Sequence, residues 1–162
     1  MKEKILTTGE LKKRIDRLKE EGKTVVFTNG CFDILHVGHV RYLEEAKKLG
    51  DVLVLGLNSD SSVRAIKGPR RPVVPEEDRA CVMAALESID FVTLFDEETP
   101  LHLIETLEPH IIVKGGDWSL ERIVGRDLVE SRGGRVVVIP EIPGSSTTNI
   151  IEKILNTRDD GQ

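Results

Sequence analysis

The chain has 162 residues, of which 39% are hydrophobic and 31% charged, a length and balance typical of one compact globular domain. Its net charge of −5 argues against a nucleic-acid-binding protein that works through bulk positive charge. The cysteines, Cys31 and Cys81, fit neither a zinc-ligand spacing nor a disulfide framework, and no apolar stretch is long enough to cross a membrane. We therefore expect a cytoplasmic protein without a signal peptide, and neither nucleic acid nor a membrane as a partner.

Short β-rich runs alternate with amphipathic stretches along the whole chain, which predicts an α/β fold with a mostly parallel five-stranded sheet and helices on both faces. We expect a single domain over residues 1–162, with its core at about 24–155. The predicted strands are 25–27, 52–57, 91–95, 111–113 and 136–139. The first predicted helix covers 9–21, the second ends at Gly50, and the third begins at Pro75 with Val82, Ala85, Leu86 and Ile89 on its apolar side. A fourth helix is predicted to start at Thr99-Pro100, and a last one to run from 147 or 148 to 155. The polar tail at 156–162 is expected to be frayed.

Polar loops follow four of these strands, at 29–39, 58–71, 114–118 and 141–148. In open parallel sheets, ligands bind outside the carboxyl ends of the strands, near the point where the strand order reverses. We therefore expect the four loops to converge on one crevice. Convergence would place His36, His39, Lys67 and the Ser-Thr-Thr run at 146–148 around a single phosphate chain.

The most informative motif is His36-Val37-Gly38-His39, which lies between a predicted strand and a predicted helix. An anion at this helix start would meet imidazole N–H groups, backbone amides and the positive end of the helix dipole together. Gly38 carries no side chain, so a triphosphate could approach the backbone closely. The alternative interpretation is structural: one histidine caps the helix and the other packs.

Residues 29–39, Asn-Gly-Cys-Phe-Asp-Ile-Leu-His-Val-Gly-His, resemble the signature of the cytidylyltransferase-like nucleotidyltransferases, and residues 144–148 resemble the second signature of that superfamily. Within it, the chain is most similar to the D-glycero-D-manno-heptose 1-phosphate adenylyltransferases, or ADP-heptose synthases, over residues 24–155. Glu141 stands where cytidylyltransferase relatives carry an arginine, which disfavours CTP. The motifs that carry this closer resemblance are at 58–60, 67–68, 71–72, 77–79, 84–87, 113–118 and 146–151.

The resemblance implies a Rossmann-like domain that transfers AMP from ATP to a sugar 1-phosphate, forming ADP-heptose and pyrophosphate for a bacterial lipopolysaccharide. It implies Mg²⁺ bound mainly through substrate phosphates, a homodimer, and a sugar kinase in the same pathway, since many relatives are the carboxyl-terminal half of a bifunctional protein. Two alternatives stay open. One is a cytidylyltransferase that acts on glycerol 3-phosphate or a related polyol phosphate, and the other is a nucleotide-binding sensor without catalysis.

The resemblance also assigns roles to individual residues. His36, His39 and Lys67 are the candidate catalytic donors to phosphate oxygens, although Lys67 could be a solvated surface lysine. Asp33 is expected to fix its loop through backbone N–H groups and is a candidate Mg²⁺ ligand. The candidate nucleotide-binding residues are Asn29, Gly30, Cys31, Phe32, Gly38, Lys114, Gly115, Gly116, Asp117, Gly144, Ser146, Thr147 and Thr148. The candidate acceptor-binding residues are Asn58, Asp60, Arg70, Arg71, Arg79 and Trp118.

Structural alternatives accompany these assignments. Plain helix N-capping explains one hydroxyl of the run 146–148 but not three. The segment 114–118 can read the base or ribose of a nucleotide, or it can be only a tight turn. Arg70 and Arg71 can clamp an acceptor phosphate or serve as solubilising loop charges. Cys31 is a small loop residue with no histidine arrangement that demands a thiolate, so we do not expect a nucleophile there.

Overall fold

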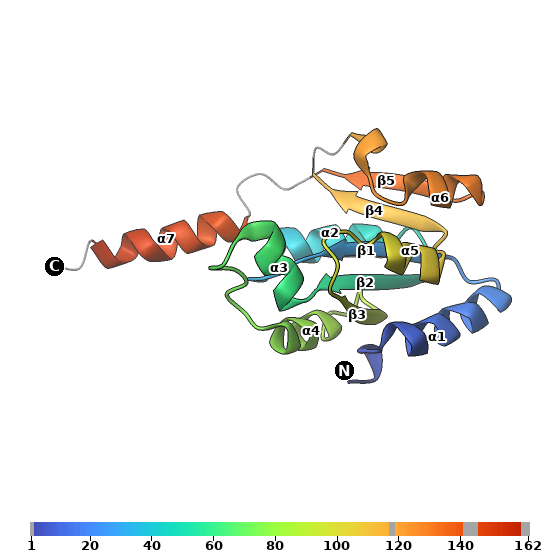
Figure 1. Ribbon diagram of the computed structural model, residues 1–162, viewed down its shortest axis with the longest axis horizontal. Helices are drawn as coiled ribbons and strands as arrows, with labels where there is room; N and C mark the ends of the chain where they lie inside the picture. Colours follow the sequence, from blue (N-terminus) through green and yellow to red (C-terminus); the bar gives the residue numbers. More distant parts are fainter. Residues whose placement is uncertain (1, 117–118, 141–145, 160–162) are drawn as a thin grey trace.

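The computed structural model describes residues 2–116, 119–140 and 146–159. Its described strands form one all-parallel sheet in the order β3-β2-β1-β4-β5 (Figure 1). The five strands are β1 (Val25–Gly30), β2 (Val52–Asn58), β3 (Phe91–Phe95), β4 (Ile111–Gly115) and β5 (Arg135–Ile139). The predicted α/β fold with five strands is therefore confirmed, and the sheet is parallel throughout.

Helices connect the strands, as parallel pairing requires. The described α-helices are α1 (Thr8–Glu20), α2 (Val37–Lys47), α3 (Asp60–Lys67), α4 (Glu76–Ala84), α5 (Leu101–Leu107), α6 (Arg126–Ser131) and α7 (Thr147–Asp159), with short 3₁₀ turns at Lys2–Lys4 and Leu120–Arg122. A capping box of Thr7 and Glu10 starts α1. Among the described residues, none of these helices has the length and apolar character needed to span a membrane.

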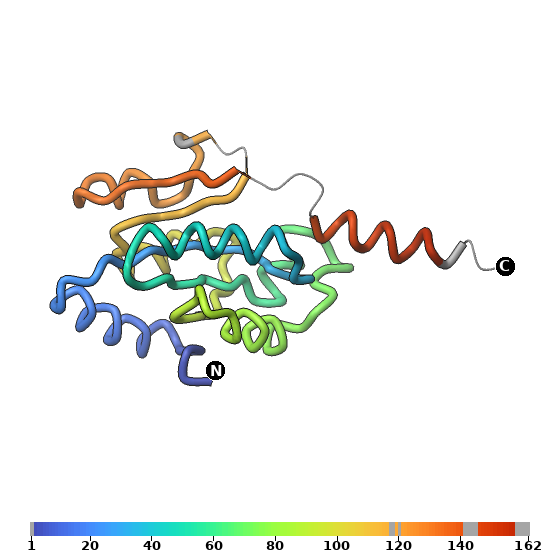
Figure 2. The backbone as a smooth tube through the Cα atoms, turned by 180° about the vertical axis from the view of Figure 1, so that it is seen from behind, coloured from blue at the N-terminus to red at the C-terminus, as the bar shows by residue number. Residues whose placement is uncertain are grey.

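Two hydrophobic layers cover the sheet, one on each face, because successive side chains of a strand point in opposite directions. Val26 of β1 packs in one layer with residues of α2 and α4, including Leu43 and Met83. Val25 and Phe27 pack in the other layer with residues of α1, α5 and α6. Figures 1 and 2 show the sheet from these two sides, with α5 in front of it in the first view and α2 in front in the second.

The strand order reverses between β1 and β4. The chain moves outward from β1 through β2 to β3, and then returns to pair β4 with the other side of β1. Tyr42 of α2 holds this junction: its hydroxyl hydrogen-bonds the Thr28 hydroxyl at 2.7 Å and donates to the Val113 carbonyl at 3.1 Å. The carboxyl ends of β1 and β4 therefore open onto a fixed crevice, which is where ligands bind in folds of this kind.

Several predicted elements need correction. The segment 58–71 is not all loop, because Ser59 caps α3, whose eight residues are too few for a clear periodic pattern. Helix α4 ends at Ala84 and buries Ala80, Met83 and Ala84, whereas Val82 is exposed and Ala85, Leu86 and Ile89 lie beyond the helix. Helix α6 was not predicted, and α7 continues to Asp159 where a frayed tail was expected from residue 156.

Candidate active site

A cavity of about 460 Å³ opens at the carboxyl edge of the sheet, beside the junction of β1 and β4. Described residues from all four expected loops line it, so the predicted convergence on one crevice is confirmed for those residues. The candidate site residues that line it are Asn29, Gly30, Cys31, Phe32, Asp33, His36, Gly38, His39, Lys67, Arg71, Lys114, Gly115, Ser146, Thr147 and Thr148.

The segment between β1 and α2 makes a tight turn at its beginning. Phe32 adopts a positive φ of 42°, a conformation that L-residues take only when their surroundings impose it. Its ring lies so close to Gly30 that a Cβ there would stand 2.8 Å from the Phe32 Cε2 atom. Gly30 is therefore required for the tight turn that leads the chain from β1 towards the two histidines.

The two histidine rings are stacked at the start of α2, with their centroids 3.7 Å apart and their planes at 24°. Burial, then the neighbouring His36 imidazole and the Lys67 ammonium, lower the pKa of His39 to about 4. His39 is therefore neutral near pH 7, and its buried Nδ1 has no hydrogen-bond partner among the described residues. His36 occupies the N-cap position of α2 without a side-chain capping bond, which disfavours the interpretation that this histidine serves as a cap.

The start of α7 closes the cavity on another side. Ser146 accepts a hydrogen bond from the Asn149 amide at 3.0 Å, so its hydroxyl caps the helix. The Thr147 hydroxyl donates to the Ile34 carbonyl at 3.2 Å and thereby joins α7 to the loop before the histidines. N-capping thus accounts for one hydroxyl of the three, and Thr148 lines the cavity.

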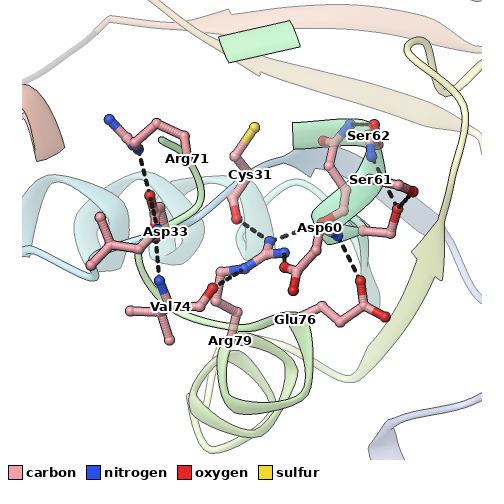
Figure 3. A network of polar contacts seen from close by, with 12 residues as sticks. Cys31, Asp33, Asp60, Ser61, Ser62, Arg71, Val74, Glu76 and Arg79 are labelled. Atoms are coloured by element: carbon pink, nitrogen blue, oxygen red, sulfur yellow. Dashed lines mark hydrogen bonds and ion pairs between the residues drawn. The ribbon is translucent and has the colours of Figure 1, made fainter. Parts of the chain in front are cut away.

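Asp33 fastens the loop after α3 to the loop after β1 (Figure 3). Its carboxylate accepts the amides of Val73 and Val74 at 2.8 and 2.9 Å and the Arg71 Nε at 2.6 Å. Burial alone would raise the pKa of this carboxyl, but the Val74 and Val73 amides and Arg71 outweigh it and hold the pKa below its usual value. Arg71 thus lines the cavity with its Nε fixed, while its Nη atoms bond no described residue.

Asn58, Asp60 and Arg79 do not line this cavity. The guanidinium of Arg79 is fully buried and donates to the carbonyls of Cys31 and Asn58 and, at 2.7 Å, to the Asp60 carboxylate (Figure 3). It also donates to the Val74 carbonyl. Arg79 therefore braces the loops that follow β1 and α3 against the end of β2 and the start of α3. Contact of Asn58, Asp60 and Arg79 with an acceptor stays a prediction.

Lys114 and Asn29 end neighbouring strands and meet at the floor of the cavity. The Lys114 Nζ donates to the Asn29 Oδ1 at 2.6 Å. Burial lowers the pKa of Lys114 to about 8, against the opposing effect of the neighbouring Cys31. Gly116 follows as a turn residue with a φ of 98°, and its amide donates to the Ile139 carbonyl rather than facing the cavity.

The other candidate residues lie elsewhere. Arg70 is exposed and does not line the cavity. Asp117, Trp118 and Gly144 lie outside the described residues. Sequence reasoning missed Arg41, Tyr42, Glu45, Ile139 and Pro140 in the lining. A signal was present for α2, because Gly38, Arg41, Tyr42 and Glu45 share one helix face by their spacing of three or four.

The described residues include no group of three His, Cys, Asp or Glu side chains placed to hold a metal ion. Both carboxylate oxygens of Asp33 are occupied by N–H donors, so this residue does not fit the role of a Mg²⁺ ligand. The expected loop-fixing role of Asp33 agrees with the structure, and the loop that it fixes is the one at 71–74.

The geometry agrees with comparisons to known proteins. The family model described as cytidylyltransferase-like matches residues 27–153, which include β1, the histidine pair and the start of α7. The chain belongs to this family. Among curated relatives, it is 58% identical to the Bifunctional protein HldE of Syntrophotalea carbinolica over 98% of this chain, and 62% identical to that of Geobacter sulfurreducens over 85%. The chain spans 32% and 28% of these two relatives, about a third of their length.

Solved structures support the fold of this cytidylyltransferase-like chain. A lipopolysaccharide core biosynthesis protein from Thermoplasma volcanium is 30% identical and superposes with a TM-score of 0.62, over 75% of this chain and 98% of that one. Pantothenate synthetase from Thermus thermophilus is 20% identical with a TM-score of 0.57, over 86% of this chain and 62% of that one. The second likeness shows the fold alone.

Proposed function

We propose that the protein transfers AMP from ATP to D-glycero-D-manno-heptose 1-phosphate, giving ADP-heptose and pyrophosphate. The observation that carries this proposal is the single cavity where the His36–His39 pair, the start of α2, Lys67 and Arg71 converge. Support comes from the membership in the cytidylyltransferase-like family and from the identity of about 60% to HldE proteins. The motif resemblance to ADP-heptose synthases supplies the acceptor.

The reaction is an in-line displacement at the α-phosphorus. An oxygen of the sugar phosphate forms the new P–O bond, and the bond from the α-phosphorus to the bridging oxygen breaks to release pyrophosphate. Because the nucleophile is already an anion, neither a covalent enzyme intermediate nor a strong base is needed. Catalysis then comes from orientation and from neutralising phosphate charge. Mg²⁺ is proposed to arrive with ATP, held by phosphate oxygens and water.

The described side chains divide this work by position. His39, neutral near pH 7, can donate one N–H to a phosphate oxygen at the start of α2, where the positive end of the helix dipole also favours an anion. Lys67 lies at the carboxyl end of α3, where it adds a charge at the cavity rim. Arg71, held by Asp33, is the candidate clamp for the acceptor phosphate, since guanidinium binds such oxygens in a bidentate way.

The test is pyrophosphate release in the presence of Mg²⁺, with ATP or CTP supplied against heptose 1-phosphate, glycerol 3-phosphate and glucose 1-phosphate. We expect release only with ATP and heptose 1-phosphate. Release with CTP and glycerol 3-phosphate would overturn the substrate assignment in favour of a cytidylyltransferase. Binding of ATP without release from any pair would favour the non-catalytic sensor.

We further propose that a sugar kinase acts in the same pathway, as the resemblance to ADP-heptose synthases implies; the relatives that the chain matches over about a third of their length are named as bifunctional proteins. The product would be an activated sugar for lipopolysaccharide assembly. We propose the cytoplasm, which supplies ATP, as the compartment of both steps.

A further inference from the structure

Lys114 lies beside the junction of β1 and β4, where the strand order of the sheet reverses. It belongs to the end of β4, its partner Asn29 to the end of β1, and these strands are the neighbours between which the strand order reverses. The proposed function puts the phosphate chain of ATP at the helix start after β1, where backbone amides favour an anion. The part of the nucleotide that crosses the junction towards β4 is then the α-phosphate with its ribose, and Lys114 lies on this side.

The surroundings of Lys114 provide a hydrogen-bond acceptor but little compensating charge. Its ammonium group is largely buried, and the amide oxygen of Asn29 takes one of its three N–H donors at 2.6 Å. No carboxylate of the described residues forms an ion pair with it. A buried cation in this state is stabilised strongly by an incoming anion and only weakly by the neutral acceptors of a nucleobase.

Resting on the proposed function, we infer that Lys114 binds the α-phosphate of the nucleotide, with Asn29 as the positioning residue that aims its ammonium group into the cavity. This role differs from reading the base or the ribose, which the glycine turn at 114–116 would equally suggest. Lys67, exposed at the rim, is then left for the outer phosphates. The α-phosphate of the transferred adenylyl group thus has a cation of its own at the floor of the cavity.

The test measures equilibrium binding of ATP, AMP and adenosine to the wild type and to Lys114→Met, which removes the charge but keeps an unbranched side chain that is shorter by one atom. We expect the Kd of ATP and AMP to rise at least about tenfold, the usual weight of a charged hydrogen bond, while that of adenosine changes less than twofold. Lys12→Met is the matched control, because Lys12 pairs with Asp16 on α1, outside the cavity lining.

A second variant, Asn29→Asp, sets a carboxylate against Lys114 without changing the size of the side chain. The new ion pair competes with phosphate, so AMP binding should weaken while adenosine binding stays unchanged. Equal weakening of all three ligands in Lys114→Met would overturn the inference in favour of a base or ribose contact. Unchanged binding of all three would overturn it in favour of a brace for Asn29.

These measurements do not depend on the acceptor. A protein that failed to release pyrophosphate with heptose 1-phosphate would disprove the proposed reaction, while the AMP and adenosine titrations would still decide the role of Lys114. Conversely, full heptose transfer together with unchanged AMP binding in Lys114→Met would leave the reaction standing and remove the α-phosphate contact.

Discussion

His39 is proposed to donate a hydrogen bond to a phosphate oxygen. Its ring stacks on His36 and lies 5.0 Å from the Phe32 ring, and its low pKa keeps it neutral in the free protein. His39→Ala should lower kcat about 100-fold to 1000-fold, the usual cost of losing one donor to a transition-state oxygen. Steady-state pyrophosphate release measures it. His102→Ala, an exposed change on α5, is the control, and wild-type turnover in His39→Ala would refute the donor role.

The contribution of Asp33 to the stability of the folded protein should depend on pH. Its folded pKa lies below the ordinary value of about 3.9, so its ionised form stabilises the folded protein at every pH above that value. This stabilisation is lost as the pH falls through the lower, folded pKa. The difference in unfolding free energy between wild type and Asp33→Asn should therefore be full at pH 6 and shrink towards pH 3. Urea unfolding across this range measures it, and a difference independent of pH would contradict the prediction.

At the scale of elements, α4 depends on one buried side chain. Arg79 joins this helix to the ends of β1 and β2 through carbonyl groups and to the start of α3 through Asp60. Arg79→Met leaves the Asp60 carboxylate without its partner, and we expect a loss of about 3–5 kcal/mol in unfolding free energy. Urea unfolding measures the change. Arg126→Met, which breaks the more exposed pair with Glu130 on α6, should cost less than about 1 kcal/mol.

At the scale of the whole molecule, binding of a nucleotide should raise the thermal stability of the folded protein. A ligand present at a hundredfold excess over its Kd stabilises the folded state by about 2.7 kcal/mol. For a chain of this length, this corresponds to a rise in Tm of about 5–10 °C. We expect ATP with Mg²⁺ to produce such a rise at a concentration where CTP produces much less. Thermal melts followed by circular dichroism test it, and an equal rise with CTP would oppose the choice of adenine.

The homodimer also belongs to this scale and stays a prediction. It comes from the family resemblance, and the mass of one chain is 18.0 kDa. Light scattering coupled to size exclusion should give about twice this mass. The mass of a single chain over the micromolar range would contradict it.

The sequence by itself determined the sheet and identified the His36-Val37-Gly38-His39 motif. Continuous apolar runs such as 52–57 are typical of strands covered on both faces. His36, Gly38 and His39 lie within four residues of the chain, so local spacing suffices to recognise them. The sequence predicted the helices less accurately, because α3 and α6 are short and the buried Arg79 interrupts the hydrophobic pattern of α4.

Only the tertiary structure decided what the isolated charged residues do. Nothing in the sequence separates the roles of Arg71 and Arg79. In the structure, Asp33 holds Arg71 at the cavity, whereas Arg79 is buried and donates to three carbonyl groups and one carboxylate. Lys114 and Asn29 are 85 residues apart and meet only because β4 returns to pair with β1. Periodicity reports which side of an element is apolar, but the partner of a buried charge depends on which strand ends the fold brings together.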